Sequence, residues 1–150
     1  MSNDSNDAGK ILKTAKRVLL IDWPNPFVPR TLIDAGFTVF CYSPDQYSAA
    51  EIVPTYPADV NQKNIFPPRN KQEGYLVFRQ LDGSPGSVDI VNVYRPEEEH
   101  AAIITNHVLP LGAKIFWLHP PGSSEQTRAL AKENGLIYIE GNDITELAMQ

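Results

Sequence analysis

The sequence predicts an α/β protein with a Rossmann-like three-layer sandwich, in which helices cover both faces of a mostly parallel sheet. Short apolar runs alternate along the chain with segments of helical periodicity, and glycine or proline separates them. Such alternation favours parallel strands joined by right-handed crossovers. The apolar run at 88–93 leads into Pro96 and three glutamates, as expected where a buried strand meets the first turn of a helix. We therefore expect strand order 3-2-1-4-5 plus a final strand.

Each expected element has its own local pattern. A short helix is expected at 29–35, between a proline that suits a first helical turn and a glycine that suits a left-handed end. A longer helix at 96–111 carries apolar residues on one face. Ser123 or Ser124 caps the next helix, and Asp143 caps a brief last one. The expected strands occupy residues 18–21, 37–42, 75–79, 88–93, 114–119 and 136–140.

Two segments lack a periodic pattern. Residues 1–15 are rich in polar residues and are predicted to form a flexible tail, with a short helix near 11–16, ahead of a domain at 16–150. Residues 45–74 are rich in proline, asparagine and tyrosine, and we predict an extended insertion there. Such an insertion either covers a ligand crevice or packs against a second subunit, so a homodimer through this segment is one expectation.

Composition limits the classes of function. The 150 residues and the 42% hydrophobic share suit one globular domain. The net charge of -5, with no run of lysine or arginine, argues against binding to nucleic acid or to anionic membranes. No apolar run reaches the ~20 residues of a membrane span, and no signal-peptide pattern is present, so we expect a cytoplasmic protein. Cys41, the single cysteine, is expected in the core and cannot form an internal disulfide.

Three motifs resemble a known family. They read Phe-Thr-Val-Phe-Cys-Tyr-Ser-Pro at 37–44, Val-Asp-Ile-Val-Asn-Val-Tyr-Arg at 88–95 and Leu-Gly-Ala-Lys-Ile-Phe-Trp-Leu at 111–118. These are similar to strand motifs of small stand-alone CoA-binding proteins of the Rossmann type, relatives of the N-terminal domain of the succinyl-CoA ligase alpha subunit. The resemblance covers about residues 18–140. It implies coenzyme A or a related adenine nucleotide as the ligand.

The sequence departs from that family at two motifs. The family has a glycine-containing turn after the first strand, whereas this chain has Ile-Asp-Trp-Pro-Asn-Pro-Phe-Val-Pro at 21–29. Three prolines remove backbone N–H donors and Asp22 adds a repelling charge, so we expect weak or absent binding of CoA. The family's Asp-Arg-Cys motif is replaced by Gly-Asn-Asp at 141–143, so no chemistry that depends on that cysteine is expected.

The candidate ligand contacts follow the strands, because open parallel sheets bind ligands at the carboxyl ends of their strands. Arg95 either holds a ligand phosphate or pairs with one of the glutamates that follow it, and the sequence leaves both open. Tyr94 either stacks on a base or packs in the core. Asp22 and Asn25 are candidates for ribose hydroxyls, and Trp23 is a candidate lid or partner contact. The full set is Asp22, Trp23, Asn25, Ser43, Tyr94, Arg95 and His119.

No catalytic or metal site is predicted. His119 follows a strand into a Pro-Pro-Gly turn, but the sequence shows no partner for acid–base work. His100 and His107 are about two helical turns apart, too far to share one ion without further ligands. The sequence therefore favours a non-catalytic CoA- or nucleotide-binding protein with a small nucleotide-type ligand. The alternative is a protein-interaction domain whose nucleotide site has degenerated.

Overall fold

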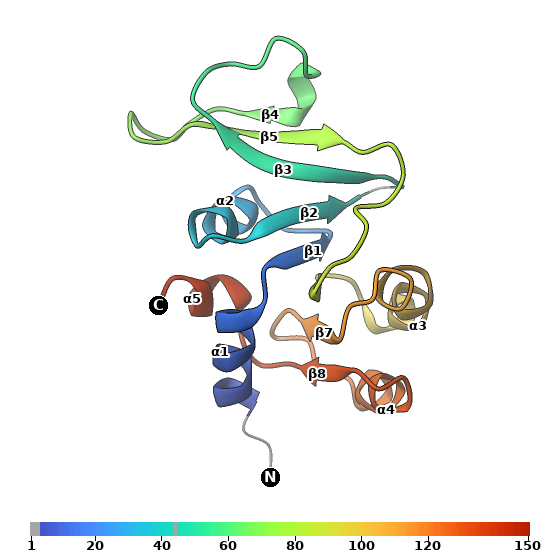
Figure 1. The fold of residues 1–150 in the computed structure, drawn as a ribbon. Coiled ribbons are helices and arrows are strands. Elements are labelled where there is room, and N and C mark those ends of the chain that lie inside the picture. Colours follow the sequence, from blue (N-terminus) through green and yellow to red (C-terminus); the bar gives the residue numbers. More distant parts are fainter. Residues whose placement is uncertain (1–3, 44) are drawn as a thin grey trace.

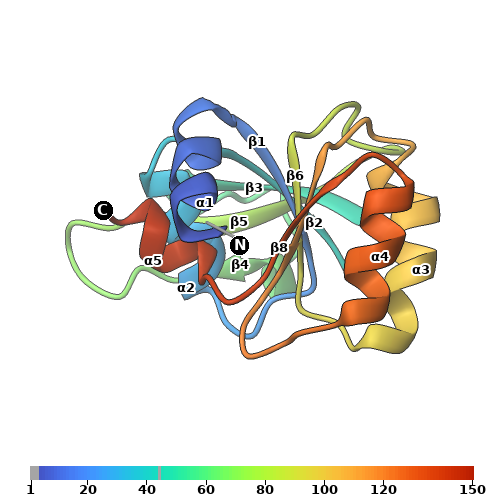
Figure 2. The same cartoon turned by 90° about the horizontal axis from the view of Figure 1, so that it is seen from below.

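One eight-stranded sheet organises the computed structural model, which describes residues 4–43 and 45–150. The strands are β1 (Arg17–Ile21), β2 (Thr38–Tyr42), β3 (Tyr47–Val53), β4 (Ile65–Phe66), β5 (Tyr75–Gln80), β6 (Ile90–Val93), β7 (Ile115–Leu118) and β8 (Ile137–Ile139). Their order across the sheet is β4-β5-β3-β2-β1-β6-β7-β8. Figure 1 shows this sheet passing between two groups of helices, and Figure 2 shows the same layers from below. The predicted Rossmann-like class is confirmed.

The centre of the sheet is parallel and buried on both faces. β1 pairs in parallel with β2 on one side and with β6 on the other, and β7 and β8 continue the parallel arrangement. Along β1, Val18 and Leu20 pack on one face, while Leu19 and Ile21 pack on the other. Strands buried on two faces need continuous apolar runs, which explains why these strands could be predicted from the sequence.

Helices cover both faces. One face carries α1 (Asp4–Thr14), α2 (Phe27–Asp34) and α5 (Ile144–Ala148), and their Ala8, Leu32 and Ile144 are fully buried in the core on that side. The other face carries α3 (His100–Ile103) and α4 (Glu125–Glu133), which contribute Ile103 and Ala131 to the second core. Figure 2 shows the two groups on opposite sides of the sheet. The short helical turns are η1 (Gln62–Asn64), η2 (Glu97–Glu99) and η3 (Ile104–Val108).

The structure differs from the sequence-based expectation at the N-terminus. A helix, α1, occupies residues 4–14 of the tail expected at 1–15, and it begins well before the short helix expected near 11–16. Residues 1–3 of that predicted tail lie outside the described residues. Ala8 is fully buried, and Ile11 and Leu12 pack against the core beside it. Tertiary packing of this apolar side supplies stability that the polar composition alone would not.

The predicted strand order needs one correction. The order 3-2-1-4-5 placed the strand at 75–79 directly beside the second strand, but β3 runs antiparallel between β2 and β5. β3 and β4 both lie in the segment 45–74, which is therefore not an irregular extended insertion. The Ser-Ala-Ala-Glu sequence within β3 has low intrinsic strand preference, so its pairing depends on neighbours that the sequence does not reveal.

The helix predicted at 96–111 is divided into three parts. The 3-10 turn η2 leads into α3, and α3 widens into a single π-helical segment, η3. Leu109 donates its backbone N–H to the Ile104 carbonyl at 3.0 Å, five residues back. Pro110 has no N–H and its ring would clash with a carbonyl of a regular helix, so a wider turn relieves the conflict. Single π turns of this kind are frequent at functional sites.

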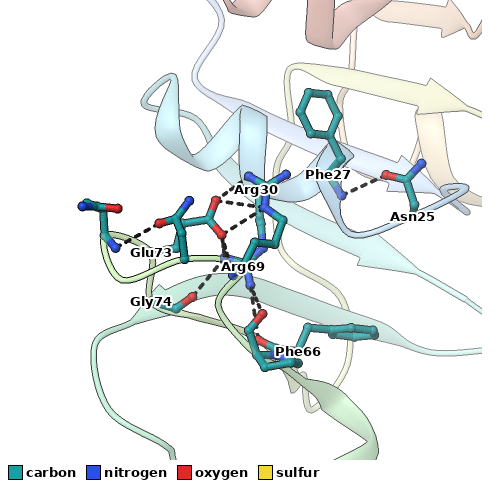
Figure 3. A network of polar contacts seen from close by, with 10 residues as sticks. Asn25, Phe27, Arg30, Phe66, Arg69, Glu73 and Gly74 are labelled. Carbon is teal, nitrogen blue, oxygen red and sulfur yellow. Dashed lines mark hydrogen bonds and ion pairs between the residues drawn. The ribbon is translucent and has the colours of Figure 1, made fainter.

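A buried arginine holds the segment around β4 against α2. Arg30, on α2, is only 2% exposed and donates to the carbonyl oxygens of Phe66 at 3.3 Å, Pro67 at 2.9 Å and Gly74 at 3.0 Å. Glu73 lies 4.0 Å from Arg30 and also forms an ion pair with Arg69 (Figure 3). Its carboxylate has a pKa of about 2, lowered first by the hydrogen bond from Arg69. The Arg30 guanidinium thus fixes a segment about forty residues away along the chain.

We expect Arg30→Met to lower the free energy of unfolding by about 2–4 kcal/mol, because three carbonyl oxygens lose the buried charged donor that they share. Chemical denaturation measures this change. Arg69→Met is the matched control, since exposed ion pairs contribute little to stability. Equal effects of the two substitutions would contradict an anchoring role for Arg30.

Candidate functional site

A cleft of about 460 Å³ lies at the carboxyl ends of β1, β2 and β6, on the face of the sheet that carries α3. The chain leaves β1 toward α2 and leaves β6 toward α3, so the connections diverge here. Parallel sheets bind ligands where neighbouring connections diverge in this way. We call this cleft the nucleotide cleft, after the ligand that the sequence analysis leads us to expect there. It is lined by Ile21, Asp22, Tyr42, Ser43, Arg95, Glu98, Glu99, Ala102, Ile103, Asn106 and His107.

Asp22 forms the turn at the mouth of the nucleotide cleft. It has a φ of 65°, in the left-handed region that glycine adopts most easily. Aspartate tolerates this conformation when its side chain bonds locally, and Asp22 Oδ1 accepts the backbone N–H of Trp23 at 3.0 Å. The turn therefore has a backbone geometry typical of glycine, and it places a carboxylate at the mouth of the cleft.

Arg95 connects the two sides of the nucleotide cleft. Its Nη1 donates to Asp22 Oδ2 at 3.1 Å, and its Nε and Nη2 donate to the two oxygens of Glu99 at 3.0 and 2.6 Å. These contacts raise the pKa of Arg95, and the hydrogen bond from Arg95 lowers the pKa of Glu99. Of the two roles left open by the sequence, the structure has the pairing with a following glutamate, together with a second ion pair to Asp22.

The helix that follows β1 presents few free donors. Asn25 Oδ1 accepts the backbone N–H of Phe27 at 2.9 Å, and the Asn25 carbonyl accepts that of Val28 at 3.4 Å (Figure 3). Pro26 and Pro29 have no N–H. A phosphate at this helix N-terminus would need the N–H groups that Asn25 already occupies. Asn25 therefore accepts the first backbone N–H groups of α2, one residue before its N-cap Pro26, and it does not line the cleft.

Tyr42 and His107 form an aromatic wall of the nucleotide cleft, and neither was predicted as a site residue. His107 lies in the π-helical segment, 4.2 Å from the ring of Tyr42 between centroids, and its Nδ1 is hydrogen-bonded to the hydroxyl of Tyr47. Burial lowers the pKa of His107 and raises that of Tyr47, so both groups favour the neutral form. This contact could not be predicted from the sequence, because it joins residues that are sixty positions apart.

The nucleotide cleft is acidic. Asp22, Glu98 and Glu99 line it together with one cation, Arg95. Glu97 points elsewhere and accepts a hydrogen bond from Ser124, which also caps α4 as expected. Three carboxylates facing one guanidinium disfavour a strongly anionic group.

A second cleft of about 480 Å³ lies at the same edge of the sheet, beside β3, β4 and β5. Trp23 and Phe78 line it and also pack against the core on the side of α2. Ser43 lines both clefts. We call this the aromatic cleft. Asp22 and Trp23, neighbours in the chain, thus serve different clefts.

The predicted contacts Tyr94 and His119 line neither cleft. Their rings lie 4.2 Å apart between centroids, and Tyr94 packs against the core on the side of α1, α2 and α5. Burial raises the pKa of Tyr94 to about 12 and lowers the pKa of His119. Side chains alternate between faces along a strand, so Tyr94 and Arg95 point to opposite sides.

In residues 4–43 and 45–150, no helix is long and apolar enough to cross a membrane. Within that same part of the chain, no three histidine, cysteine or acidic side chains come together in a group that could hold a metal ion.

Comparison with protein families identifies the class. The model of the CoA-binding domain family matches residues 22–144, so this chain belongs to that family. The match covers β2 through β8 and both clefts. A search of curated proteins found no match.

Solved structures confirm the fold. Prb, a protein redesigned for binding, superposes with a TM-score of 0.64 at 18% identity, over 98% of this chain and 90% of that one. A hypothetical protein from Pyrococcus horikoshii OT3 gives 0.63 at 18% identity, over 99% and 91% of the two chains. The protein ID.343 from Thermus thermophilus gives 0.60 at 19% identity, over 99% and 98%.

We expect the free energy of unfolding to fall as the pH drops below about 6.5, the ordinary pKa of histidine. Burial holds the pKa of His107 below that value, so the unfolded chain takes up its proton first and gains stability relative to the folded one. His119 acts in the same direction. Denaturation at a series of pH values measures the slope, and His107→Gln should make it shallower. An NMR titration that gave His107 a pKa above 6.5 would contradict this account.

Proposed function

We propose that this protein binds coenzyme A or a related adenine nucleotide without catalysing a reaction on it, and that the nucleotide cleft takes the adenosine part. The observation that carries the proposal is the position of this cleft at the diverging ends of β1 and β6, in a chain of the CoA-binding domain family. Its volume of about 460 Å³ is within the range of small-molecule sites.

The lining of the nucleotide cleft suits a purine nucleoside. Tyr42, Ala102 and Ile103 offer an apolar wall for a flat ring. The Asn106 amide, exposed on the π-helical segment, has the donor and acceptor pair that matches the edge of adenine. Placing Asn106 and His107 at the cleft is a consequence of the π turn.

The charges suit the ribose better than the diphosphate. A carboxylate accepts hydrogen bonds from ribose hydroxyls, and Asp22 and Glu98 both face the cleft. A diphosphate would approach these same carboxylates and would find the first turn of α2 capped by Asn25. We therefore expect the phosphates to extend toward solvent and to add little affinity.

A non-catalytic role is supported by the contacts of the cleft residues. Among the described residues that line the cleft, His107 is hydrogen-bonded to Tyr47 and not to the Ser43 hydroxyl. Covalent catalysis needs a nucleophile held by a base and a cradle of N–H donors for the developing charge.

We expect wild-type protein to bind adenosine and CoA with similar, weak affinity. Asp22→Asn should tighten CoA roughly fivefold relative to adenosine, because it removes one repelling charge near the phosphates, while any weaker hydrogen bond to the ribose affects both ligands alike. Asparagine also tolerates a left-handed φ, so the turn is preserved. Isothermal calorimetry with both ligands measures the two affinities.

Low-micromolar binding of CoA by wild-type protein would show that the altered turn still cradles a diphosphate. Absence of binding by adenosine and CoA alike, with no retained adduct in native mass spectrometry, would reject the proposed function.

We expect Arg95→Ala to weaken CoA about tenfold or more, because it removes the one cation of the cleft and leaves Asp22 and Glu99 uncompensated. The melting temperature should change little, since Arg95 is 40% exposed and its ion pairs are screened by water. Unchanged CoA binding with a lowered melting temperature would identify Arg95 as a structural partner of Asp22 and Glu99.

The second candidate function is a protein-interaction domain. It is favoured by one observation, namely that the ligand-binding groups at the switch point are satisfied within the chain: Arg95 by two carboxylates and the start of α2 by Asn25. Tyr56, 52% exposed in the segment 45–74, offers a contact for a second copy of the chain. Light scattering that gave a dimer, together with no nucleotide binding, would favour this candidate.

A further inference from the structure

The aromatic cleft is separate from the nucleotide cleft and has a different chemistry. It lies on the α2 side of the sheet, over the antiparallel strands β3 and β5, whereas the nucleotide cleft lies on the α3 side. Ser43 is the residue that the two have in common. The lining consists of Trp23, Ser43, Gln46, Ser48, Lys63, Asn64, Phe66, Phe78 and Gln80.

Three aromatic rings form one side of the aromatic cleft. Trp23 is stacked on Phe78 with centroids 5.3 Å apart, and Phe66 meets Phe78 edge to face at 5.6 Å. Phe78 is 6% exposed, while Trp23 and Phe66 are half-buried. Buried Phe78 therefore packs against Trp23 and Phe66, and these two rings are partly accessible from the cleft. A planar ring gains more against such surfaces than a saturated group of the same size.

Polar side chains complete the lining of the aromatic cleft. Gln80 donates an amide N–H to the side-chain carbonyl of Gln46. This bond does not use the Gln46 amide N–H groups or the Gln80 side-chain carbonyl. Ser48 is the direct partner of Gln80 in the β3–β5 pair. Asn64 adds a further amide. These amide and hydroxyl groups can form hydrogen bonds with a polar substituent on the ring of a bound ligand.

Lys63 is the one charged residue among the described residues that line the aromatic cleft. Its backbone N–H is held by Asn61 Oδ1 at 3.0 Å, which caps η1 and fixes where the lysine side chain begins. The nearby charges of Arg79 and Glu51 pair with each other on the other face of the strands. An anionic group therefore meets attraction here, in contrast to the acidic nucleotide cleft.

The wall that carries Lys63 and Phe66 is fixed before any ligand arrives. Arg30 binds the carbonyl of Phe66 itself, and Figure 3 shows the guanidinium between that carbonyl and Glu73. Trp23, which is stacked on Phe78, follows the constrained turn at Asp22. A preformed site loses little conformational entropy on binding.

We propose that the aromatic cleft binds a small aromatic carboxylate, with the ring against Trp23 and Phe66 and the carboxylate toward Lys63. This site goes beyond the proposed nucleotide function and does not require it, because the aromatic cleft has a lysine of its own and, of the described residues, shares only Ser43 with the nucleotide cleft.

Benzoate is the test ligand, and the indole N–H signals of the protein report its binding by NMR. The chain has two tryptophans. Trp23 lines the aromatic cleft, while Trp117 is fully buried in β7 and donates its indole N–H to the Asn142 carbonyl at 2.8 Å. We expect benzoate to shift the Trp23 signal with millimolar affinity and to leave the Trp117 signal in place.

Two analogues separate the contributions of charge and planarity. Benzamide keeps the ring and lacks the charge, and cyclohexanecarboxylate keeps the charge and lacks the planar ring. We expect both to bind at least threefold more weakly than benzoate.

Lys63→Met keeps the aliphatic stem, and we expect it to weaken benzoate about fivefold without affecting benzamide. Lys71→Met is the matched control, because Lys71 is an exposed lysine in the same segment that does not line the cleft. Since Lys63 is exposed, its substitution does not disturb the core.

The proposal is overturned if benzoate leaves the Trp23 signal unmoved up to about 10 mM, a concentration that populates even a fragment-strength complex. It is also overturned if Lys63→Met and Lys71→Met bind benzoate equally well. Adenosine binding is measured on the same samples, so a failure of the nucleotide cleft is seen separately from a failure of the aromatic cleft.

Discussion

The ion pairs of Arg95 are the interaction on which the ligand-binding edge of the sheet depends. Arg95 follows β6, Asp22 follows β1, and Glu99 begins the helical segment beyond, so one guanidinium joins the ends of two neighbouring parallel strands to the next layer. The contact sets the charge at this edge of the sheet. A cation that is shared by two carboxylates attracts a phosphate less than a free one would.

The strict alternation of side chains along parallel strands divides the functions of that edge between two faces. Even-numbered residues of β1 face α2 and odd-numbered residues face α3, and the turn that follows sends Asp22 and Trp23 to different clefts. The antiparallel strands β3, β4 and β5 extend the sheet only on one side, so they build a wall for the aromatic cleft alone.

The sequence predicted most of the central sheet because its strands are apolar on both faces, but the site depended on contacts between distant segments. Asp22 and Ser43 line the nucleotide cleft because both directly follow a central strand, and their contact with a ligand stays a prediction. Tyr94 was placed there too, although the alternation along β6 puts it on the face opposite Arg95, a pattern that the sequence already contained. His107 could not be predicted, because its position requires a π turn and a tyrosine from β3. β3 was missed because the Ser-Ala-Ala-Glu sequence in its middle has little intrinsic preference for a strand.

The position of Cys41 gives the protein an internal reporter of its own opening. The thiol lies in β2, next to the central strand, with no exposed surface, and burial raises its pKa far above the ordinary value. A thiol-reactive reagent needs the thiolate and direct access to the sulfur, and the folded chain provides neither. The modification rate of Cys41 is therefore governed by how often the middle of the sheet separates. Any ligand that ties the strand ends together will slow that reaction without touching the sulfur.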